Sequence, residues 1–155
     1  MEISQMSFSI SFLDEPLIYE EDDPAYVAAA GKLVIGDWEE IFVSSLYLWS
    51  KEDYMAQWMH AIRSMLNGSE KAALIVEYLG PDAGRLWWWP MYRVGGSVYL
   101  REQILFFDQL KEPFSLEKAF SFIQDHRAIN EDGYKISEWS VTVSEVKEFA
   151  HELSI

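Results

Sequence analysis

AALIVEYLGPDAGRLWWWPMYRVGGSVYLREQILFF, residues 72–107, is the stretch that decides the fold. Three runs rich in β-branched and aromatic residues fall within it: 72–79, 85–93 and 98–107. Gly80–Gly84 and Gly95-Gly96 separate these runs, and both carry the residues that tight turns favour. Because short loops join antiparallel neighbours, the sequence predicts a three-stranded antiparallel meander.

A helix is predicted upstream of the meander, over about Lys51–Leu66. Ser50 followed by Asp53 is a capping-box pattern, and Asn67-Gly68 supplies a stop signal. Apolar residues recur between them at helical spacing: Tyr54, Met55, Trp58, Met59, Ile62, Met65 and Leu66.

The residues before this helix predict strands and one long loop. Phe8–Phe12 alternates apolar residues with serines, as a half-buried strand does. Residues 14–24 are acidic and predict a loop. Lys32–Ile35 and Glu40–Trp49 are predicted to pair as a hairpin around the turn signal Gly36-Asp37.

The residues after the meander predict two helices and one strand. Ser115 is the expected cap of a short helix, and Tyr134–Val141 the expected strand. The last helix should begin at Ser144, or at Thr142 paired with Glu145. Strands grouped in a meander with helices set apart predict an α+β fold, in which a mostly antiparallel twisted sheet packs with about three helices.

Length and composition fit one domain spanning residues 1–155. Half of the residues are apolar, which is enough for one core. The chain has no cysteine, so disulfides, thiolate nucleophiles and cysteine-based zinc sites are excluded. No apolar run approaches the ~20 residues of a spanning helix, and Met1–Gln5 lacks the features of a secretory signal. We therefore expect a cytoplasmic protein.

The charge is strongly negative, at −14. Such a field repels phosphate backbones and anionic membranes, so direct binding to nucleic acid or membrane is not expected. It attracts a basic protein partner, although solubility alone would also explain it. The candidate binding residues are the acids that crowd the first 40 residues: Asp14, Glu15, Glu20, Glu21, Asp22, Asp23, Asp37, Glu39 and Glu40.

Trp87-Trp88-Trp89 is the most unusual run in the chain. Side chains alternate along a strand, so Trp88 must face away from its two neighbours. Either both faces of this strand are covered, or one face presents a tryptophan to a partner, since tryptophan is enriched at interface hot spots. We take Trp88 as the outward candidate.

No catalytic, metal or cofactor site is predicted. The histidines, His60, His126 and His151, belong to no recognisable metal or catalytic motif, and His126 is expected to have a structural role at a helix end. Glu20–Asp23 could attract a hard cation but lacks the alternate spacing and the turn glycine of a calcium loop.

Three motifs resemble those of the CdiI immunity proteins of bacterial contact-dependent growth inhibition systems. These motifs are the aromatic segment Tyr47–Tyr54 followed by Trp58, the aromatic hairpin Trp87–Gln103, and Asp132–Trp139, which ends in Lys-Ile-Ser-Glu-Trp. The resemblance covers about residues 40–155. The first 40 residues carry none of these motifs. Ile136 and Trp139 are better explained by packing against the core than by a direct role in function.

The resemblance implies a non-enzymatic protein, with a fold similar to whirly domains, that binds the C-terminal toxin domain of a CdiA effector. Such toxins are often nucleases, and a nuclease needs a basic groove that an acidic protein complements. The alternative is a non-catalytic ligand-binding or regulatory module with an aromatic pocket. A hydrolase using Glu20 and Asp22 is the weakest reading, because no base, nucleophile and orienting group can be assembled.

Overall fold

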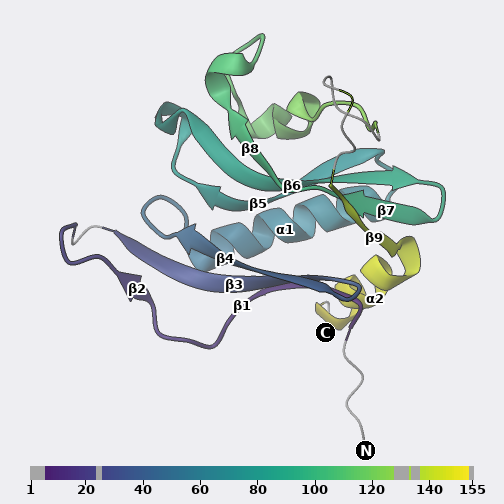
Figure 1. Ribbon diagram of the computed structural model, residues 1–155, viewed down its shortest axis with the longest axis horizontal. Helices are drawn as coiled ribbons and strands as arrows, with labels where there is room; N and C mark the ends of the chain where they lie inside the picture. The colour runs from purple at the N-terminus through teal and green to yellow at the C-terminus, as the bar shows by residue number, and fades with distance from the viewer. Residues whose placement is uncertain (1–5, 24–25, 128–132, 134–136, 154–155) are drawn as a thin grey trace, which may run out of the picture.

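The computed structural model describes residues 6–23, 26–127, 133 and 137–153. In this part of the chain two antiparallel sheets pack with two α-helices and three short 3₁₀ helices (Figure 1). The strands are β1 (Phe8–Phe12), β2 (Ile18–Tyr19), β3 (Val27–Ile35), β4 (Trp38–Ser45), β5 (Lys71–Tyr78), β6 (Arg85–Val94), β7 (Ser97–Leu100), β8 (Gln103–Phe106) and β9 (Trp139–Thr142). The helices are α1 (Lys51–Leu66), α2 (Val143–Leu153), η1 (Pro81–Ala83), η2 (Phe107–Gln109) and η3 (Leu116–Phe122). The α+β class is confirmed, with the strands divided between two sheets.

The first sheet is built around β3. β1 and β2 pair with one edge of β3, and β4 pairs with the other edge. The predicted hairpin is confirmed, because Ile35 pairs with Trp38 across the turn at Gly36-Asp37. Gly36 has φ 61°, a left-handed conformation that glycine adopts without strain.

The second sheet contains the predicted meander, with β6 at its centre. The third predicted strand, 98–107, is divided into β7 and β8, which both pair with β6 in one unbroken register: Met91 with Leu100 and Trp88 with Gln103. The division falls opposite Pro90. Its carbonyl accepts a hydrogen bond from the Arg101 N–H at 3.0 Å, but proline has no N–H to return the bond.

α1 spans the predicted residues and lies between the two sheets (Figure 1). The predicted capping box is present: the Asp53 N–H donates to Ser50 Oγ at 3.2 Å, and the Ser50 N–H donates to the Asp53 carboxylate at 2.9 Å. The apolar side of α1 buries aromatic and aliphatic side chains in the core: Tyr54, Trp58, Ala61, Ile62 and Met65.

α1 also seals the outer edge of β5. The Gln57 amide donates to the Ala73 carbonyl and accepts from the Ile75 N–H, both at 2.8 Å, and the Trp58 indole donates to the Ile75 carbonyl at 2.8 Å. These side chains take the place of a neighbouring strand, so the backbone groups of this edge are satisfied without one.

The two sheets meet along the same edge. The Tyr54 hydroxyl donates to the Ser45 carbonyl at 2.7 Å and accepts from the Tyr78 N–H at 3.1 Å. Burial raises the pKa of Tyr54 to about 12, so the hydroxyl keeps the proton that it donates. Beside it, the Ser44 hydroxyl donates to the carbonyl of Val76, at a bulge in β5.

The C-terminal third differs from prediction at one helix. The segment after Ser115 is the 3₁₀ helix η3, interrupted by non-helical backbone at Lys118, and the Ser115 side chain makes no capping hydrogen bond. Its neighbour Phe114 stacks on Phe107 with ring centroids 4.6 Å apart. Packing of aromatic rings onto the second sheet therefore holds this short segment, rather than a cap.

The last helix agrees with prediction, whereas the last strand agrees in part, since it begins at Trp139 and the described residues Ser137 and Glu138 precede it. β9 pairs antiparallel with β7, whereas residues 134–136 of the predicted strand lie outside the described residues. The second of the two expected helix starts is confirmed: the Glu145 N–H donates to Thr142 Oγ1 at 3.1 Å, and the Thr142 N–H donates to the Glu145 carboxylate at 2.9 Å. No described helix is long and apolar enough to cross a membrane.

Candidate functional site

One face of the second sheet is covered by the chain that follows β8. Phe114 lies against Tyr78, and His126 lies against the rings of Tyr92 and Tyr99, with centroids 6.5, 4.9 and 5.2 Å apart. Trp88 points into this covered face. It is fully buried, and its indole N–H donates to Gln103 Oε1 at 2.7 Å. The expectation that Trp88 faces outward is therefore wrong, because residues 107–127 cover the face to which it belongs.

The opposite face of the sheet is covered over only part of its length. Along β6, Trp89 is 1% exposed, whereas Trp87, two residues away on the same face, is 38% exposed. The same change occurs along the neighbouring segment, from buried Leu100 to Ile104 at 39% and Phe106 at 42%. Trp87 pairs directly with Ile104. We call these three exposed side chains, Trp87, Ile104 and Phe106, the apolar strip.

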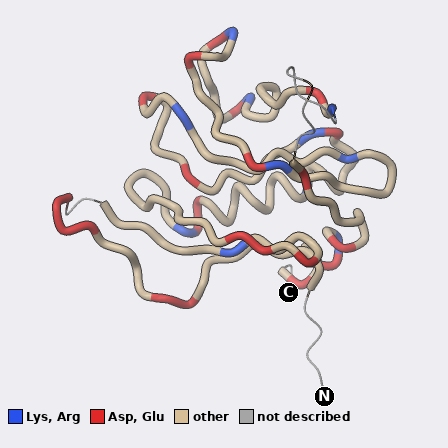
Figure 2. The backbone as a smooth tube through the Cα atoms, viewed as in Figure 1, with Lys and Arg blue, Asp and Glu red and all other residues tan. Residues whose placement is uncertain are grey.

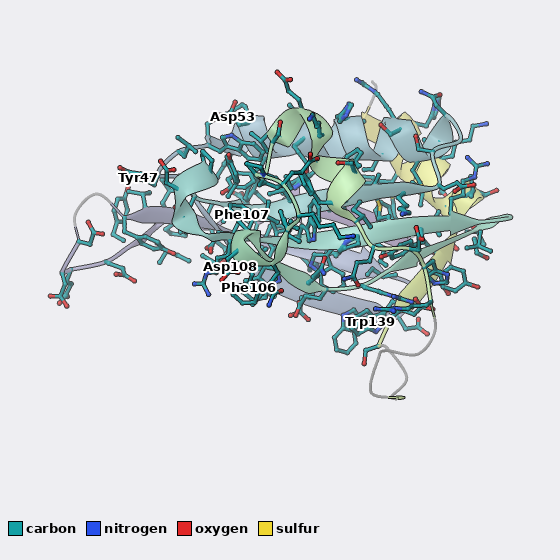
Figure 3. The ribbon with its side chains drawn as sticks, turned by 90° about the horizontal axis from the view of Figure 1, so that it is seen from above. Tyr47, Asp53, Phe106, Phe107, Asp108 and Trp139 are labelled. Carbon is teal, nitrogen blue, oxygen red and sulfur yellow. The ribbon has the colours of Figure 1, made fainter. Side chains whose placement is uncertain are left out.

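A cluster of three tryptophans lies beside the apolar strip, in the covered part of this face. Trp139 of β9 stacks on Trp38 of the β3–β4 hairpin, with centroids 4.9 Å apart, and lies 5.5 Å from Trp89. The Trp89 indole N–H is buried and has no hydrogen-bond partner among the described residues. Figure 3 shows Phe106 and Trp139 along one side of the molecule. Trp89 of this cluster and Trp87 of the apolar strip lie on the same face of β6, two residues apart.

Carboxylates stand beside the apolar strip on two sides. Glu102 is exposed and shares a face with Ile104, and its pKa is raised by burial and by the nearby charge of Glu40. We call Glu40 and Glu102 the carboxylate pair. On β5, Glu77 is the cross-strand partner of Trp87. With Arg85, Leu86, Trp87 and Ile104 it lines a hollow of about 80 Å³. Burial raises the pKa of Glu77, and the charge of Arg85 opposes this rise.

The predicted acidic residues lie in two places rather than one (Figure 2). Asp37, Glu39 and Glu40 belong to the β3–β4 hairpin, where Glu40 is half-buried and the other two are exposed. The remaining acids flank β2 and are all exposed; we call them the acidic loop: Asp14, Glu15, Glu20, Glu21, Asp22 and Asp23. β2 pairs with the Val27 end of β3, and the hairpin turn is at the Ile35 end. At ~3.3 Å per residue the two groups stand roughly 26 Å apart.

Sequence reasoning missed Ile104, Phe106 and Glu102 as site residues. The two-residue turn at Gly95-Gly96 sets the register that places Ile104 opposite Trp87, so this pairing was available from the sequence. No local signal shows which face of the strand stays uncovered, because distant segments supply the cover.

The described residues hold no group of three histidine and acidic side chains that could bind a metal ion. His60 stacks on Phe120 with ring centroids 5.6 Å apart, and His126 Nε2 lies 3.1 Å from a Glu138 carboxylate oxygen. His126 thus contacts rings and a carboxylate rather than the end of an α-helix. A cavity of about 410 Å³ opens between α1 and η3, lined in part by Trp49, His60 and Phe120. None of Trp87, Trp88 and Trp89 lines this cavity.

Comparison with known proteins gives three consistent matches. Residues 44–149 match the family described as CdiI N-terminal domain. The immunity protein CdiI of Enterobacter cloacae subsp. cloacae is 28% identical over 148 residues, which cover 95% of this chain and 99% of that protein. The solved CdiA-CT/CdiI toxin and immunity complex from Enterobacter cloacae contains a chain that matches with a TM-score of 0.83 and 27% identity, over 95% of this chain and 98% of that one. The matches to the relative and to the solved structure, each over 95% of the chain, extend into the first 40 residues, where the sequence shows no family motif.

Proposed function

The chain belongs to the CdiI N-terminal domain family, and on this premise we propose that it is an immunity protein that binds and neutralises the C-terminal toxin domain of a cognate CdiA effector. The observation that supports this most directly is the match over 95% of the chain to the toxin and immunity complex from Enterobacter cloacae. The proposal includes a cytoplasmic location and a purely binding role, without catalysis by this chain.

We further propose that the toxin is a basic nuclease whose active-site groove is covered by the acidic side of this chain. The net charge of −14 supports this proposal, since it raises the rate of encounter with a basic partner and disfavours nucleic acid as the ligand. A nuclease groove is lined by cations that bind phosphates, so a carboxylate surface competes with the substrate for those cations.

The decisive experiment mixes the purified chain with the purified toxin domain encoded beside it. We expect a stable complex and loss of toxin activity once the two reach equal concentration. Activity of the toxin on RNA and DNA, measured first without this chain, tests whether it is a nuclease. Absence of a complex, and undiminished toxin activity at a large excess of this chain, would contradict the proposed function.

Salt tests the electrostatic part separately. Attraction between separated charges is screened by salt, whereas contacts already formed are screened much less. The association rate is therefore expected to fall steeply between low and physiological salt, with little change in the dissociation rate. An association rate that does not depend on salt would remove the acidic-surface mechanism and leave the immunity function intact.

A further inference from the structure

We propose that the apolar strip, with the carboxylate pair beside it, is the centre of the toxin-binding surface and receives an apolar toxin side chain flanked by lysine or arginine. This inference rests on the proposed function and deepens it by naming the surface and the chemistry of its partner. Two features of the strip carry it: the apolar side chains are grouped, and carboxylates stand beside them.

The grouping of the strip sets it apart from ordinary surface apolar residues. Isolated exposed apolar side chains are common, whereas contiguous ones mark interaction sites. Trp87 and Ile104 are direct cross-strand partners, and Phe106 lies on the same face two residues beyond Ile104. All three are 38–42% exposed, whereas Trp89 and Leu100, which continue the same face, are at most 1% exposed. The fold therefore buries this face up to the strip and leaves the strip available.

The chemistry around the strip selects a basic partner. The pKa of Glu102 is raised by burial and by the like charge of Glu40, so the two carboxylates repel each other. A lysine or arginine side chain placed between them would relieve this repulsion and form charge-assisted hydrogen bonds. On β5, the cross-strand partner of Trp87 is a third carboxylate, Glu77, which lines the hollow together with Arg85. An apolar centre with charged groups at its rim is the arrangement found at tight protein interfaces.

The acidic loop is the less suitable centre. It stands roughly 26 Å from the hairpin acids, by the length of β3. Its carboxylates are exposed, and exposed rim charges change association rates more than they hold a bound partner. We therefore assign to the acidic loop the electrostatic steering of toxin association, and to the strip the contacts that slow toxin dissociation.

The test uses a matched pair of variants, Ile104→Arg and Ile41→Arg. Ile104 belongs to the strip, whereas Ile41 is 55% exposed on the face of β4 opposite to buried Phe42, away from α1. Both variants add the same charge at an exposed strand isoleucine. Ile104→Arg is expected to weaken toxin binding by at least ~30-fold, mainly through faster release, as loss of a hot spot does. Ile41→Arg is expected to change binding by less than about 3-fold, within the effect of one charge at a rim.

A second strip variant, Trp87→Ala, leaves the charge unchanged and is expected to weaken binding by a similar factor. Circular dichroism and thermal unfolding establish that each variant is folded, and Trp87→Ala decides the matter if Ile104→Arg is not. Wild-type affinity in a folded strip variant, or equal losses in Ile104→Arg and Ile41→Arg, would overturn this inference while the immunity function stands. Failure of the wild-type chain to bind the toxin would instead reject the proposed function itself.

Discussion

The β5 edge and the β8 end of the second sheet differ in how completely the rest of the chain covers them. At the β5 edge, side chains of α1 occupy the backbone groups of the strand, and the hydroxyl of Tyr54 connects β5 to β4. At the β8 end, Trp87, Ile104 and Phe106 are left partly exposed beside two carboxylates that repel each other. At the β5 edge, each of these backbone groups has a hydrogen-bond partner within the chain. At the β8 end, apolar side chains and carboxylates remain accessible to a partner.

The contrast is sharpest between two adjacent residues of one type. Trp88 is fully buried and hydrogen-bonded to Gln103, whereas Trp87 is exposed on the other face of the same strand. A step of one residue along a strand reverses the direction of the side chain. Neighbouring tryptophans can therefore serve stability and binding separately, and each prediction below tests that separation.

The largest effect is expected for Trp88→Ala. Removal of a buried tryptophan leaves a cavity and costs about 3–5 kcal/mol of unfolding free energy, and here it also leaves Gln103 without its donor. Trp87→Ala removes a side chain that is already partly in water and should cost less, roughly 2–3 kcal/mol. Urea denaturation of both variants measures the difference. Equal losses of stability would show that Trp87 and Trp88, on opposite faces of the sheet, contribute equally to the stability of the fold.

The next effect is expected at the sealed edge, for Gln57→Leu. This change removes the partners of the Ala73 carbonyl and the Ile75 N–H. A buried backbone group left without a partner costs about 1–3 kcal/mol. Amide hydrogen exchange at Ile75 should accelerate together with the loss of stability, while toxin binding by the folded variant stays unchanged.

Ser64→Ala is the control on the same helix, because among the described residues the Ser64 hydroxyl bonds to the His60 carbonyl of its own helix and to no other strand or helix. Its effect should stay within about 0.5 kcal/mol. Unchanged Ile75 exchange in Gln57→Leu would mean that the edge of β5 does not depend on α1.

A smaller effect, confined to rates, is expected for the acidic loop. The combined change Glu20→Gln, Glu21→Gln and Asp22→Asn should slow toxin association by about 3–10-fold at low salt, since charge steers encounter. The dissociation rate should not change. The matched control removes three exposed acids elsewhere: Glu117→Gln, Glu148→Gln and Glu152→Gln. If both sets slow association equally, net charge rather than the acidic loop steers the encounter.

The sequence predicted the elements whose causes are local. The bounds of α1, its capping box and the capping box of α2 all depend on residues within a few positions of each other, and all were correct. The Gly36-Asp37 hairpin was correct for the same reason. Family motifs likewise identified the kind of protein, and they include Tyr54 and Trp58, whose side chains bond to β4 and β5.

What the sequence did not predict depends on distant parts of the chain. The orientation of Trp88 depends on the segment 107–127, which covers its face from beyond the meander. The acidic residues form one group in sequence, but β3 carries the hairpin acids away from the acidic loop. The pKa of Glu102 is raised in part by Glu40, which comes from the first sheet. Site residues were missed because sites are assembled by packing, and packing is not a local property.

The smallest expected effect is the dependence of stability on pH that arises at the carboxylate pair. The pKa of Glu102 is raised above its ordinary value of 4.5, first by burial and then by Glu40. Between the ordinary and the raised pKa the folded chain binds more protons than the unfolded chain, so the free energy of unfolding falls as pH rises through that window. The unfavourable contribution is complete at neutral pH and absent below the ordinary pKa. Glu102→Gln should therefore stabilise the free chain near pH 7 and not in acid.

The gain for Glu102→Gln should be below about 1 kcal/mol, because water screens charges on exposed side chains. Glu40→Gln should give part of the same gain, and the double variant less than the sum, since each change removes the same repulsion. In the toxin complex the effect should have the opposite sign. A toxin cation bound between Glu40 and Glu102 needs both charges, so each variant should weaken binding. Urea denaturation at pH 4 and pH 7, with and without toxin, measures both signs. A variant that stabilises the free chain and leaves binding unchanged would place the carboxylate pair outside the interface. These two substitutions therefore decide whether the charges at the β8 end serve toxin binding.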